Sequence, residues 1–397
     1  MKVEKINIRD IGGIKLASLV FNPKMNVICG YNGVGKTTIL ECISHSFSSG
    51  VRTNILSRNA TSQDGAFEMH AINDDGKIFN TEYKINHFSP TEDDHLYSSE
   101  TEFKKLNIIT LKIERYLDYK TILSINKDPM ISNHEKSLRI IGGSKTGDFK
   151  SWFLNRYLYS SHEGSLTDEQ QQNLLLAKKC FSILDSNYSF SRVIASDNEI
   201  MLNTPSGEIY FEYLSSGFKS CLAILFTIIK EIELMSLSKK DRAVDFSGIV
   251  IIDEPEIHLH PSWQSRIREI LLSVFPNAQF ICATHSPHIV QSCNESEVIA
   301  LASNNGYIKR KSLWSDSKYG FKGWTIEEIL SDVMGIDDVR TDLYKNKVND
   351  FYQAADKNNA KKAKSIFNEI DKMLHPENMD RKILKMDLAM LTGGDHD

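Results

Sequence analysis

The sequence contains no hydrophobic run long enough to cross a membrane. The longest mainly apolar stretch, Cys221 to Ile229, is far short of the ~20 residues that a membrane-spanning helix needs. The first residues alternate charged and apolar side chains and lack the hydrophobic centre of a signal peptide. These absences argue against membrane and secreted proteins, so we expect a cytoplasmic chain with no membrane partner.

The cysteines and the charge balance exclude further classes of protein. The six cysteines are scattered and form no CxxC pair, which argues against a zinc finger or a disulfide framework. Lys and Arg number 47 against 52 Asp and Glu, a formal net charge of −5. Such a chain does not bind polyanions over its whole surface, so any DNA contact needs a local basic patch. The 397 residues, 41% of them hydrophobic, provide for about two or three folding units.

Apolar patterns divide the chain into an α/β part and a helical end. Alternating or continuous apolar residues predict strands at 2–8, 16–21, 25–29, 67–72, 77–85, 106–113, 249–252, 279–283, 297–301 and 307–311. Apolar residues at helical spacing predict helices at 36–47, 148–186, 216–235, 262–274 and beyond 324. Residues 48–65 are typical of an exposed loop, 190–212 of short strands, and 114–147 show no clear pattern.

The strand at 25–29 leads into a glycine-rich segment that matches G-x-x-x-x-G-K-[ST]. The segment consists of Gly30, Tyr31, Asn32, Gly33, Val34, Gly35, Lys36 and Thr37, and Thr38 follows it. Its glycines let successive backbone N–H groups face phosphate oxygens, and the following helix adds the dipole of its N-terminus. In such a loop Lys36 neutralises the β- and γ-phosphates, and the Thr37 hydroxyl binds Mg²⁺. We therefore predict a nucleotide site that takes ATP and Mg²⁺.

A second motif ends the apolar strand at 249–252 with two carboxylates, Asp253 and Glu254. A parallel strand beside the phosphate-loop strand would place Asp253 near Mg²⁺. Glu254 would position or deprotonate the attacking water, a role that a hydrolase needs and a simple nucleotide binder does not. Strands often end in Asp, so the motif gains its weight from the phosphate loop.

A third motif lies between the phosphate loop and the Asp-Glu pair, and a fourth follows the Asp-Glu pair. The segment Leu-Ser-Ser-Gly, which contains Ser215, Ser216 and Gly217, opens the helix at 216–235. His285 follows the strand at 279–283. By itself the serine would be an ordinary helix N-cap and the histidine a satisfied core residue. The order of phosphate loop, serine–glycine signature, Asp-Glu pair and histidine favours a functional role for all four.

On these residues and in this order, the chain resembles ABC-type ATPase heads of the RecF, SMC and OLD branch over residues 1–315. The resemblance implies an α/β fold. A P-loop ATPase head would have a mixed sheet, flanking helices and a helical lobe, and an α-helical C-terminal extension would follow the head. It predicts four parts. Residues 1–147 form the N-terminal part of the head, with the phosphate loop and an insert, and residues 148–235 form the helical lobe with the signature. Residues 236–315 form the C-terminal part of the head, with the Asp-Glu and His motifs, and residues 316–397 form the extension.

The resemblance also implies an assembly. In that superfamily two heads dimerise head to tail, and each signature covers the ATP of the other head. It implies that Ser215, Ser216 and Gly217 act in trans on the partner's γ-phosphate, whereas His285 contacts it in cis and shares catalysis with Glu254. A serine hydroxyl, backbone N–H groups and a helix N-terminus form an anion site that needs a phosphate presented to it. We therefore expect a homodimer or a higher homo-oligomer.

Several features of the sequence indicate which members of this branch the chain resembles most. After Asp-Glu the sequence continues Pro-Glu-Ile-His-Leu-His-Pro, similar to OLD-like compact ATPases, and transporter ATPases usually differ there. His258 and His260 are either a metal pair or residues that shape this loop at the dimer interface, and we favour the role in the loop. Gln63 is one candidate for the glutamine loop, although its region does not align clearly. OLD proteins carry a metal-binding Toprim nuclease domain, whereas the sole Asp-x-Asp of this chain is its terminal Asp395-His-Asp397. If the protein controls a nuclease, that nuclease is a separate chain.

A compact ATPase with a helical extension and no nuclease of its own resembles the PtuA family of Septu anti-phage ATPases. The segment at 324–335 is similar to one that follows the ATPase core there. The resemblance implies an ATP-hydrolysing defence subunit that regulates a separate HNH nuclease like PtuB and reaches DNA through the complex. A RecF-like DNA-repair ATPase is the alternative, with basic patches at 309–311 and 361–364 as its DNA contacts. A transporter ATPase subunit is a third and weaker reading.

The helical end carries two apolar stripes. We expect the first at Val339, Leu343, Val348, Phe351 and Ala355, and the second at Ala360, Ala363, Phe367, Ile370 and Leu374. They would pack on each other and on the ATPase core, or their outer surface would serve self-assembly or nuclease docking.

Overall fold

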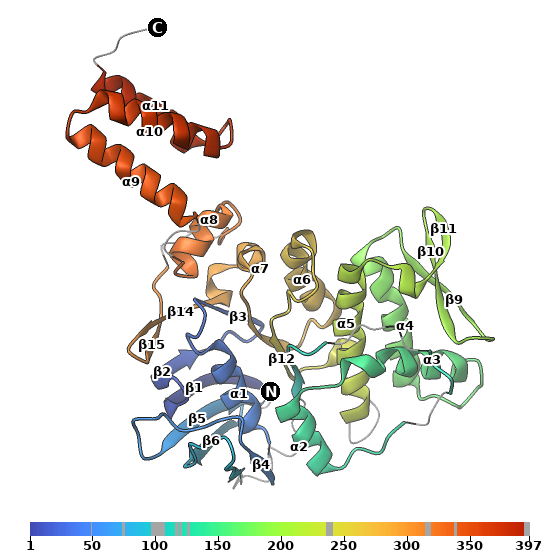
Figure 1. The fold of residues 1–397 in the computed structure, drawn as a ribbon. Coiled ribbons are helices and arrows are strands. Elements are labelled where there is room, and N and C mark those ends of the chain that lie inside the picture. Colours follow the sequence, from blue (N-terminus) through green and yellow to red (C-terminus); the bar gives the residue numbers. More distant parts are fainter. Residues whose placement is uncertain are drawn as a thin grey trace. The chain divides into compact units, whose positions relative to one another are not determined.

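The computed structural model describes residues 1–48, 50–73, 76–96, 108–115, 119, 121–124, 128–235, 241–313, 319–336 and 340–392. The chain divides into two compact units, Met1–Gly335 (unit 1) and Ile336–Asp397 (unit 2) (Figure 1). Residues 316–335 thus belong to unit 1, and the four-part division remains a prediction. Within the described residues, no helix has the length and apolar character to cross a membrane.

Unit 1 is built on a ten-stranded mixed sheet. Its order is β6 (Ile78–Ile85), β5 (Gly65–Ile72), β1 (Lys2–Ile11), β2 (Ile14–Val20), β15 (Tyr307–Arg310), β14 (Val298–Asn304), β3 (Met25–Cys29), β13 (Gln279–Ala283), β12 (Ile249–Asp253) and β8 (Ile108–Leu111). The strands from β14 to β8 are parallel, whereas β2, β1, β5 and β6 are antiparallel. The parallel half carries the predicted ATP motifs at the carboxyl ends of its strands, where open α/β sheets bind ligands.

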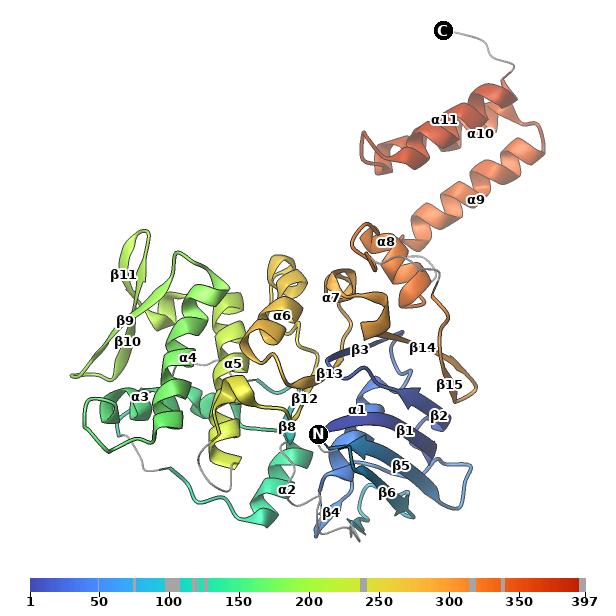
Figure 2. The ribbon, with the colours of Figure 1, turned by 180° about the vertical axis from the view of Figure 1, so that it is seen from behind.

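The parallel strands are buried on both faces, as their continuous apolar sequences predict. In β12, Val250 and Ile252 join one core cluster and Ile249 and Ile251 join the other. The cluster that contains Ile249 and Ile251 includes the apolar side chains of α1 (Lys36–Ser46). The cluster that contains Val250 and Ile252 includes apolar side chains of α5 (Ser216–Met235), α6 (Pro261–Val274) and α7 (Pro287–Ser292) (Figures 1 and 2). The sheet is therefore the central layer of unit 1.

A helical lobe extends beyond β8. It contains α3 (Phe149–Tyr159), α4 (Asp168–Leu184), α5 and a three-stranded sheet of β9 (Ser189–Ile194), β10 (Glu199–Thr204) and β11 (Gly207–Tyr210). Phe153, Phe181 and Phe226 pack against one another at its centre. Beside them the buried guanidinium of Arg156 pairs with the buried carboxylate of Glu233. A lone buried charge is costly, so this pair makes the lobe depend on both residues.

The structure adds elements where the sequence pattern was weak. Helix α2 (Asn133–Gly142) lies in the stretch without a clear pattern, and the Ser132 hydroxyl caps it by accepting from the Glu135 N–H. In the expected loop at 48–65, β4 (Val51–Thr53) pairs with β7 (Asp94–Leu96). Both strands are three residues long, too short for a periodic pattern to stand out. Part of the hairpin turn between β5 and β6, and residues 106–107 of the predicted strand, lie outside the described residues.

The end of unit 1 and unit 2 have separate cores. Helix α8 (Ile326–Glu328) and the π-helical turn Ile329–Val333 follow the sheet, and Ile329, Val333 and Met334 join the core of unit 1. Unit 2 contains α9 (Asp342–Asp356), α10 (Ala360–Met373) and α11 (Met379–Leu391).

The prediction of the first apolar stripe is wrong at one residue. Leu343 is 60% exposed, whereas its neighbour Tyr344 is buried with Phe351 and Ala354, and Val348 packs against them. The buried face of α9 therefore runs through position 344, and Val339 lies outside the described residues. The second stripe is confirmed on α10 for Ala363, Phe367 and Ile370. These three helices form a core of their own.

Candidate functional site

The phosphate loop closes over the side chain of Lys36. The loop connects β3 to α1, and Gly33 and Gly35 have φ angles of 78° and 102°, which favour glycine. A Cβ on Gly35 would lie 2.9 Å from the Ile14 side chain, so a larger residue would disturb the loop. The Lys36 ammonium donates to the carbonyl oxygens of Gly30 at 2.9 Å and Tyr31 at 3.0 Å. Burial lowers the pKa of Lys36, which lies 5% exposed beneath the loop.

The predicted Mg²⁺ ligands lie together. The Thr37 hydroxyl at the start of α1 donates to Asp253 Oδ2 at the end of β12, across 3.2 Å. The expectation that the two strands are neighbours is wrong, because β13 pairs with both and lies between them. The two strands are nevertheless parallel to β13, so their carboxyl ends reach the same edge of the sheet. Burial raises the pKa of Asp253, and the hydrogen bond from Thr37 opposes that shift.

Glu254 has an unusual backbone conformation. Its φ angle is 48°, in the left-handed region that a non-glycine residue rarely adopts. Its N–H donates to the Ala283 carbonyl at the end of β13, across 2.9 Å. The Glu254 carboxylate lies 3.9 Å from His285 Nε2, and both side chains are partly exposed. Burial and the charge of Lys36 lower the pKa of His285. These residues thus come together from β12 and from the loop after β13.

Glu256 was not predicted as a site residue, yet it fixes the histidine loop. Its carboxylate accepts a hydrogen bond from the Thr284 hydroxyl at 2.8 Å and from the His285 N–H at 2.6 Å. Burial raises the pKa of Glu256, and these hydrogen bonds oppose that rise. The Pro-Glu pair after Asp-Glu could have drawn attention to Glu256. The hydrogen-bond partners of its carboxylate, however, lie 28 and 29 residues further along the chain.

Arg115 is a second residue that the sequence did not reveal. It follows β8 and lies 4% exposed, with its Nη2 donating to the carbonyl oxygens of Asp253 and Glu254. Burial lowers its pKa, while the nearby carboxylates of Glu256, Asp253 and Glu254 raise it. Together with Lys36, it places two cations beside three carboxylates. A divalent cation would offset the remaining negative charge.

The signature lies at the N-terminus of α5. The Ser215 hydroxyl caps the helix by accepting from the Phe218 N–H at 3.3 Å, so the N-cap reading holds. Ser215 and Ser216 are exposed, and Gly217 is buried against Trp263, whose Cδ1 would lie 3.0 Å from an added Cβ. Among the described residues, no hydrogen bond joins the signature to the phosphate loop of the same chain. The role in trans stays a prediction.

The paired histidines have separate local roles. His258 is exposed with a φ angle of 64°, and the His260 ring caps α6 by accepting from the Ser262 N–H. In the described part of the chain, no group of three or more His, Cys, Asp or Glu side chains could hold a metal ion. The interpretation that the two histidines shape the loop stays a prediction. Gln63 is exposed in the segment before β5, and its role as the glutamine loop stays a prediction.

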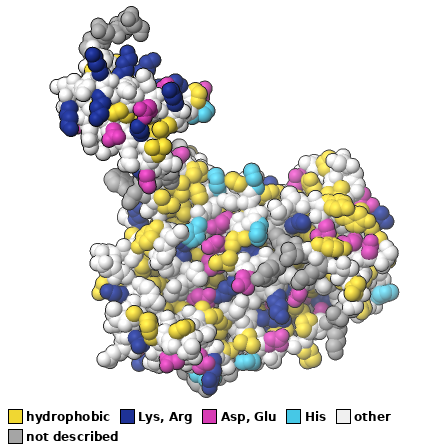
Figure 3. Space-filling view, viewed as in Figure 1, with side chains coloured by type: hydrophobic (Ala, Val, Ile, Leu, Met, Phe, Trp, Pro, Cys, Tyr) yellow, Lys and Arg dark blue, Asp and Glu magenta, His cyan; other side chains and the backbone are white. Residues whose placement is uncertain are grey.

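The two basic patches of the DNA-repair alternative differ in their contacts. Arg310 donates to the Val298 carbonyl at 2.9 Å, so part of the 309–311 patch holds the sheet together. On unit 2, Figure 3 shows many Lys and Arg side chains next to acidic ones. Lys361, Lys362 and Lys364 of the second patch are exposed on α10. A nucleic-acid contact at either patch stays a prediction.

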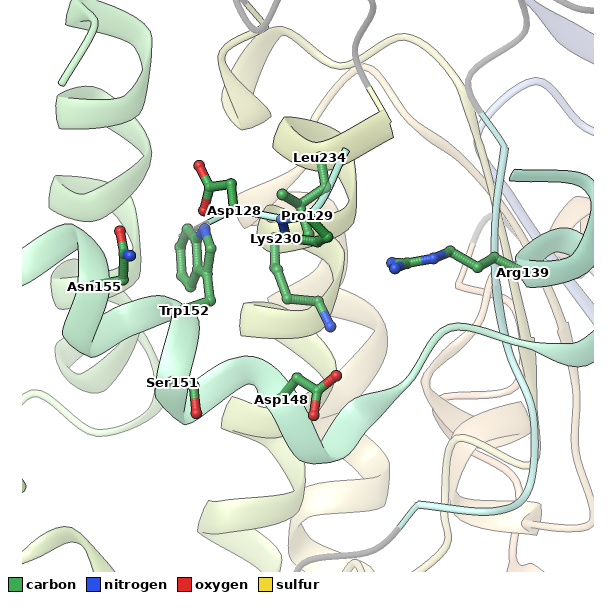
Figure 4. Close-up of a pocket in the computed structure, with 9 residues that line it drawn as sticks. All are labelled: Asp128, Pro129, Arg139, Asp148, Ser151, Trp152, Asn155, Lys230 and Leu234. Carbon is green, nitrogen blue, oxygen red and sulfur yellow. The ribbon is translucent and has the colours of Figure 1, made fainter. Parts of the chain in front are cut away.

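The lobe contains a hollow of about 280 Å³ between α2, α3 and α5 (Figure 4). Figure 4 shows Arg139 and Lys230 facing it from two sides. Arg139 donates to both carboxylate oxygens of Glu231 at 3.1 Å, and Lys230 lies 3.1 Å from the same carboxylate. Asp128 accepts from Arg156 at 2.7 Å. Because these charges are paired within the lobe, the hollow is a polar part of its packing and lies apart from the phosphate loop.

The sheet order, the phosphate loop, the Asp-Glu strand end and the lobe that opens with the signature define an ABC-type P-loop ATPase head. Residues 25–291 match the family model described as "AAA domain, putative AbiEii toxin, Type IV TA system". The chain is 38% identical to Septu protein PtuA of Bacillus thuringiensis over 98% of each chain. It belongs to this AAA domain family and, within it, to the PtuA family.

A second relative and a solved structure extend the comparison. Septu protein PtuA of Bacillus mycoides (strain KBAB4) is 25% identical over 86% of this chain and 45% of that protein. An SMC head bound to the C-winged helix domain of ScpA superposes with a TM-score of 0.49 at 14% identity, over 78% of this chain and 96% of that chain.

Proposed function

We propose that the chain is the ATP-binding and ATP-hydrolysing subunit of a Septu-like anti-phage defence system. The observation that carries the proposal is the contact of the Thr37 hydroxyl with Asp253 at 3.2 Å, beside the buried ammonium of Lys36. This arrangement supplies what a nucleoside triphosphate requires at its β- and γ-phosphates. Membership of the PtuA family supports the defence role.

The residues present fit a Mg²⁺ ion. A hydroxyl and a carboxylate are hard oxygen donors, and Mg²⁺ typically takes one or two such groups and fills its other positions with phosphate and water. Thr37 and Asp253 would hold the ion, which would neutralise developing charge between the β- and γ-phosphates. Lys36 would contribute a second positive charge. Because the Lys36 ammonium now donates to two loop carbonyls, ATP binding would require it to exchange these for phosphate oxygens.

Glu254 and His285 would act on the γ-phosphate side. Glu254 is partly exposed and can accept a proton from a water molecule or orient it for attack. His285, held by the Glu256 carboxylate through its backbone N–H, would donate to the γ-phosphate. Burial and the charge of Lys36 lower the pKa of His285, which favours the neutral ring. A neutral ring can still donate one N–H, so this role needs no charge on the histidine.

The ATP site would be completed by a second copy of the chain. Ser215 and Ser216 are exposed at the N-terminus of the 20-residue helix α5, and Gly217 keeps the backbone there close to Trp263. A helix N-terminus with exposed hydroxyls favours a phosphate group. In a head-to-tail dimer, or a higher oligomer of such dimers, this surface would cover the ATP held by the partner.

The defence effector would be a separate HNH-type nuclease, and DNA would be reached through that complex. Unit 2 offers it an independent surface, because its three helices have their own core. Co-expression with a candidate HNH nuclease tests the proposal, with affinity capture of the nuclease as the readout. We expect the full chain to bind the nuclease and a chain ending at Gly335 to lose this binding. If the full chain hydrolyses ATP but neither chain binds the nuclease, the nuclease role is contradicted and the ATPase assignment still stands.

A further inference from the structure

Arg115 joins the edge strand of the sheet to the catalytic strand end. Its Nε donates to the Lys112 carbonyl at 3.1 Å, which fixes the guanidinium against the end of β8. Its Nη2 donates to the Glu254 carbonyl at 2.6 Å and also to that of Asp253. β8 pairs in parallel with β12, so the two strand ends stay level at this point. One planar guanidinium thus reaches three carbonyl groups at the carboxyl ends of two strands.

These carbonyls flank the residue with the unusual backbone. Glu254 has a φ angle of 48°, and such a conformation persists in a non-glycine residue only when its surroundings fix it. The peptide before Glu254 is held on both sides, since its N–H donates to Ala283 and its carbonyl accepts from Arg115. The peptide after Glu254 is held through its carbonyl, which accepts from Arg115 and from the Ile257 N–H at 3.1 Å. Arg115 supplies the side-chain part of these contacts, so the direction of the Glu254 side chain depends in part on this buried guanidinium.

We propose that Arg115 is a positioning residue for ATP hydrolysis, which holds the backbone of Glu254 so that its carboxylate meets the attacking water. This inference rests on the proposed hydrolytic role of Glu254. Arg115 touches no part of the predicted phosphate loop among the described contacts, so it acts on the reaction through Glu254. Lysine would keep the charge but lacks the planar set of donors that spans three carbonyls.

The test is a double-mutant cycle of Arg115→Lys and Glu254→Gln, with single-turnover hydrolysis and ATP affinity measured for each full-length variant. Arg268→Lys is the matched control, because Arg268 makes a partly buried ion pair with Glu297 away from the site. We expect Arg115→Lys to lower the hydrolysis rate by roughly 10–100-fold, since a small misplacement of a catalytic group has effects of this size. ATP affinity should change less than about threefold, and Arg268→Lys should hydrolyse ATP at the wild-type rate.

The cycle separates positioning from general damage. If Arg115 acts through Glu254, Arg115→Lys should not lower the residual rate of the Glu254→Gln variant further. A further decrease in the double variant, or an unchanged rate in the single variant, would overturn the inference. If Arg115→Lys does not fold, Arg115→Gln repeats the cycle under the same criteria. A wild-type rate for Glu254→Gln would instead remove the proposed role of Glu254, a distinct outcome.

Discussion

Two truncations that differ by five residues should behave very differently. A chain ending at Leu330 loses Val333 and Met334, which are 0% and 1% exposed in the core of unit 1. Burying such a side chain contributes about 1.5–3 kcal/mol, so the deletion should cost roughly 3–6 kcal/mol of unfolding free energy. A chain ending at Gly335 keeps both residues and removes unit 2 at its boundary. Because domains are stable by about 5–15 kcal/mol, the shorter chain should lose a large share of its unfolding free energy.

Urea unfolding of the two chains, followed by circular dichroism, measures this difference. We expect the chain ending at Gly335 to unfold with the same midpoint as unit 1 within the full chain, and to bind ATP. The chain ending at Leu330 should unfold at a much lower urea concentration. Equal midpoints would refute the reasoning, because the π-helical turn Ile329–Val333 would then contribute nothing to the core. Loss of ATP binding by the longer chain would show that unit 2 supports the head.

Two further predictions concern the site and the helix behind it. Glu254→Gln should bind ATP normally in calorimetry and hydrolyse it about 10²–10⁴-fold more slowly, because the amide cannot accept a proton; an unchanged single-turnover rate would exclude Glu254 as the base. Burial lowers the pKa of His45 from 6.5 to about 4, so the unfolded chain binds a proton more readily between these values. Stability should therefore fall by about 3 kcal/mol as the pH decreases from about 6.5 to 4, and His45→Gln should flatten that part of the pH profile.

The sequence predicts the parts of the site that depend on local pattern. The phosphate loop needs a strand, glycines and a helix in succession, and the structure has β3, that loop and α1 in these positions. The strand ending in Asp253 is predicted equally well, because a strand buried on both faces is continuously apolar. The insertion of β13 between the two strands was missed, since strand order depends on long-range pairing.

The residues that sequence reasoning missed act through distant partners. Arg115 lies in a stretch without periodicity, and it donates to backbone carbonyls 138 and 139 residues away. Backbone acceptors leave no trace in the sequence, so no motif indicates this contact. Leu343 and Tyr344 show the same limit on a smaller scale. Either residue could extend the apolar stripe of α9, and the packing of three helices selects Tyr344.

The central claim is that two copies of the chain share each ATP site, and mixing two inactive variants tests it most directly. Lys36→Ala removes the cation of the phosphate loop, and Ser216→Arg obstructs the signature. In a head-to-tail mixed dimer, the intact loop of one chain meets the intact signature of the other. We predict that the mixture recovers about a quarter of the wild-type ATPase rate, because half of randomly paired dimers would carry one intact site. A mixture no more active than either variant alone would contradict the shared site.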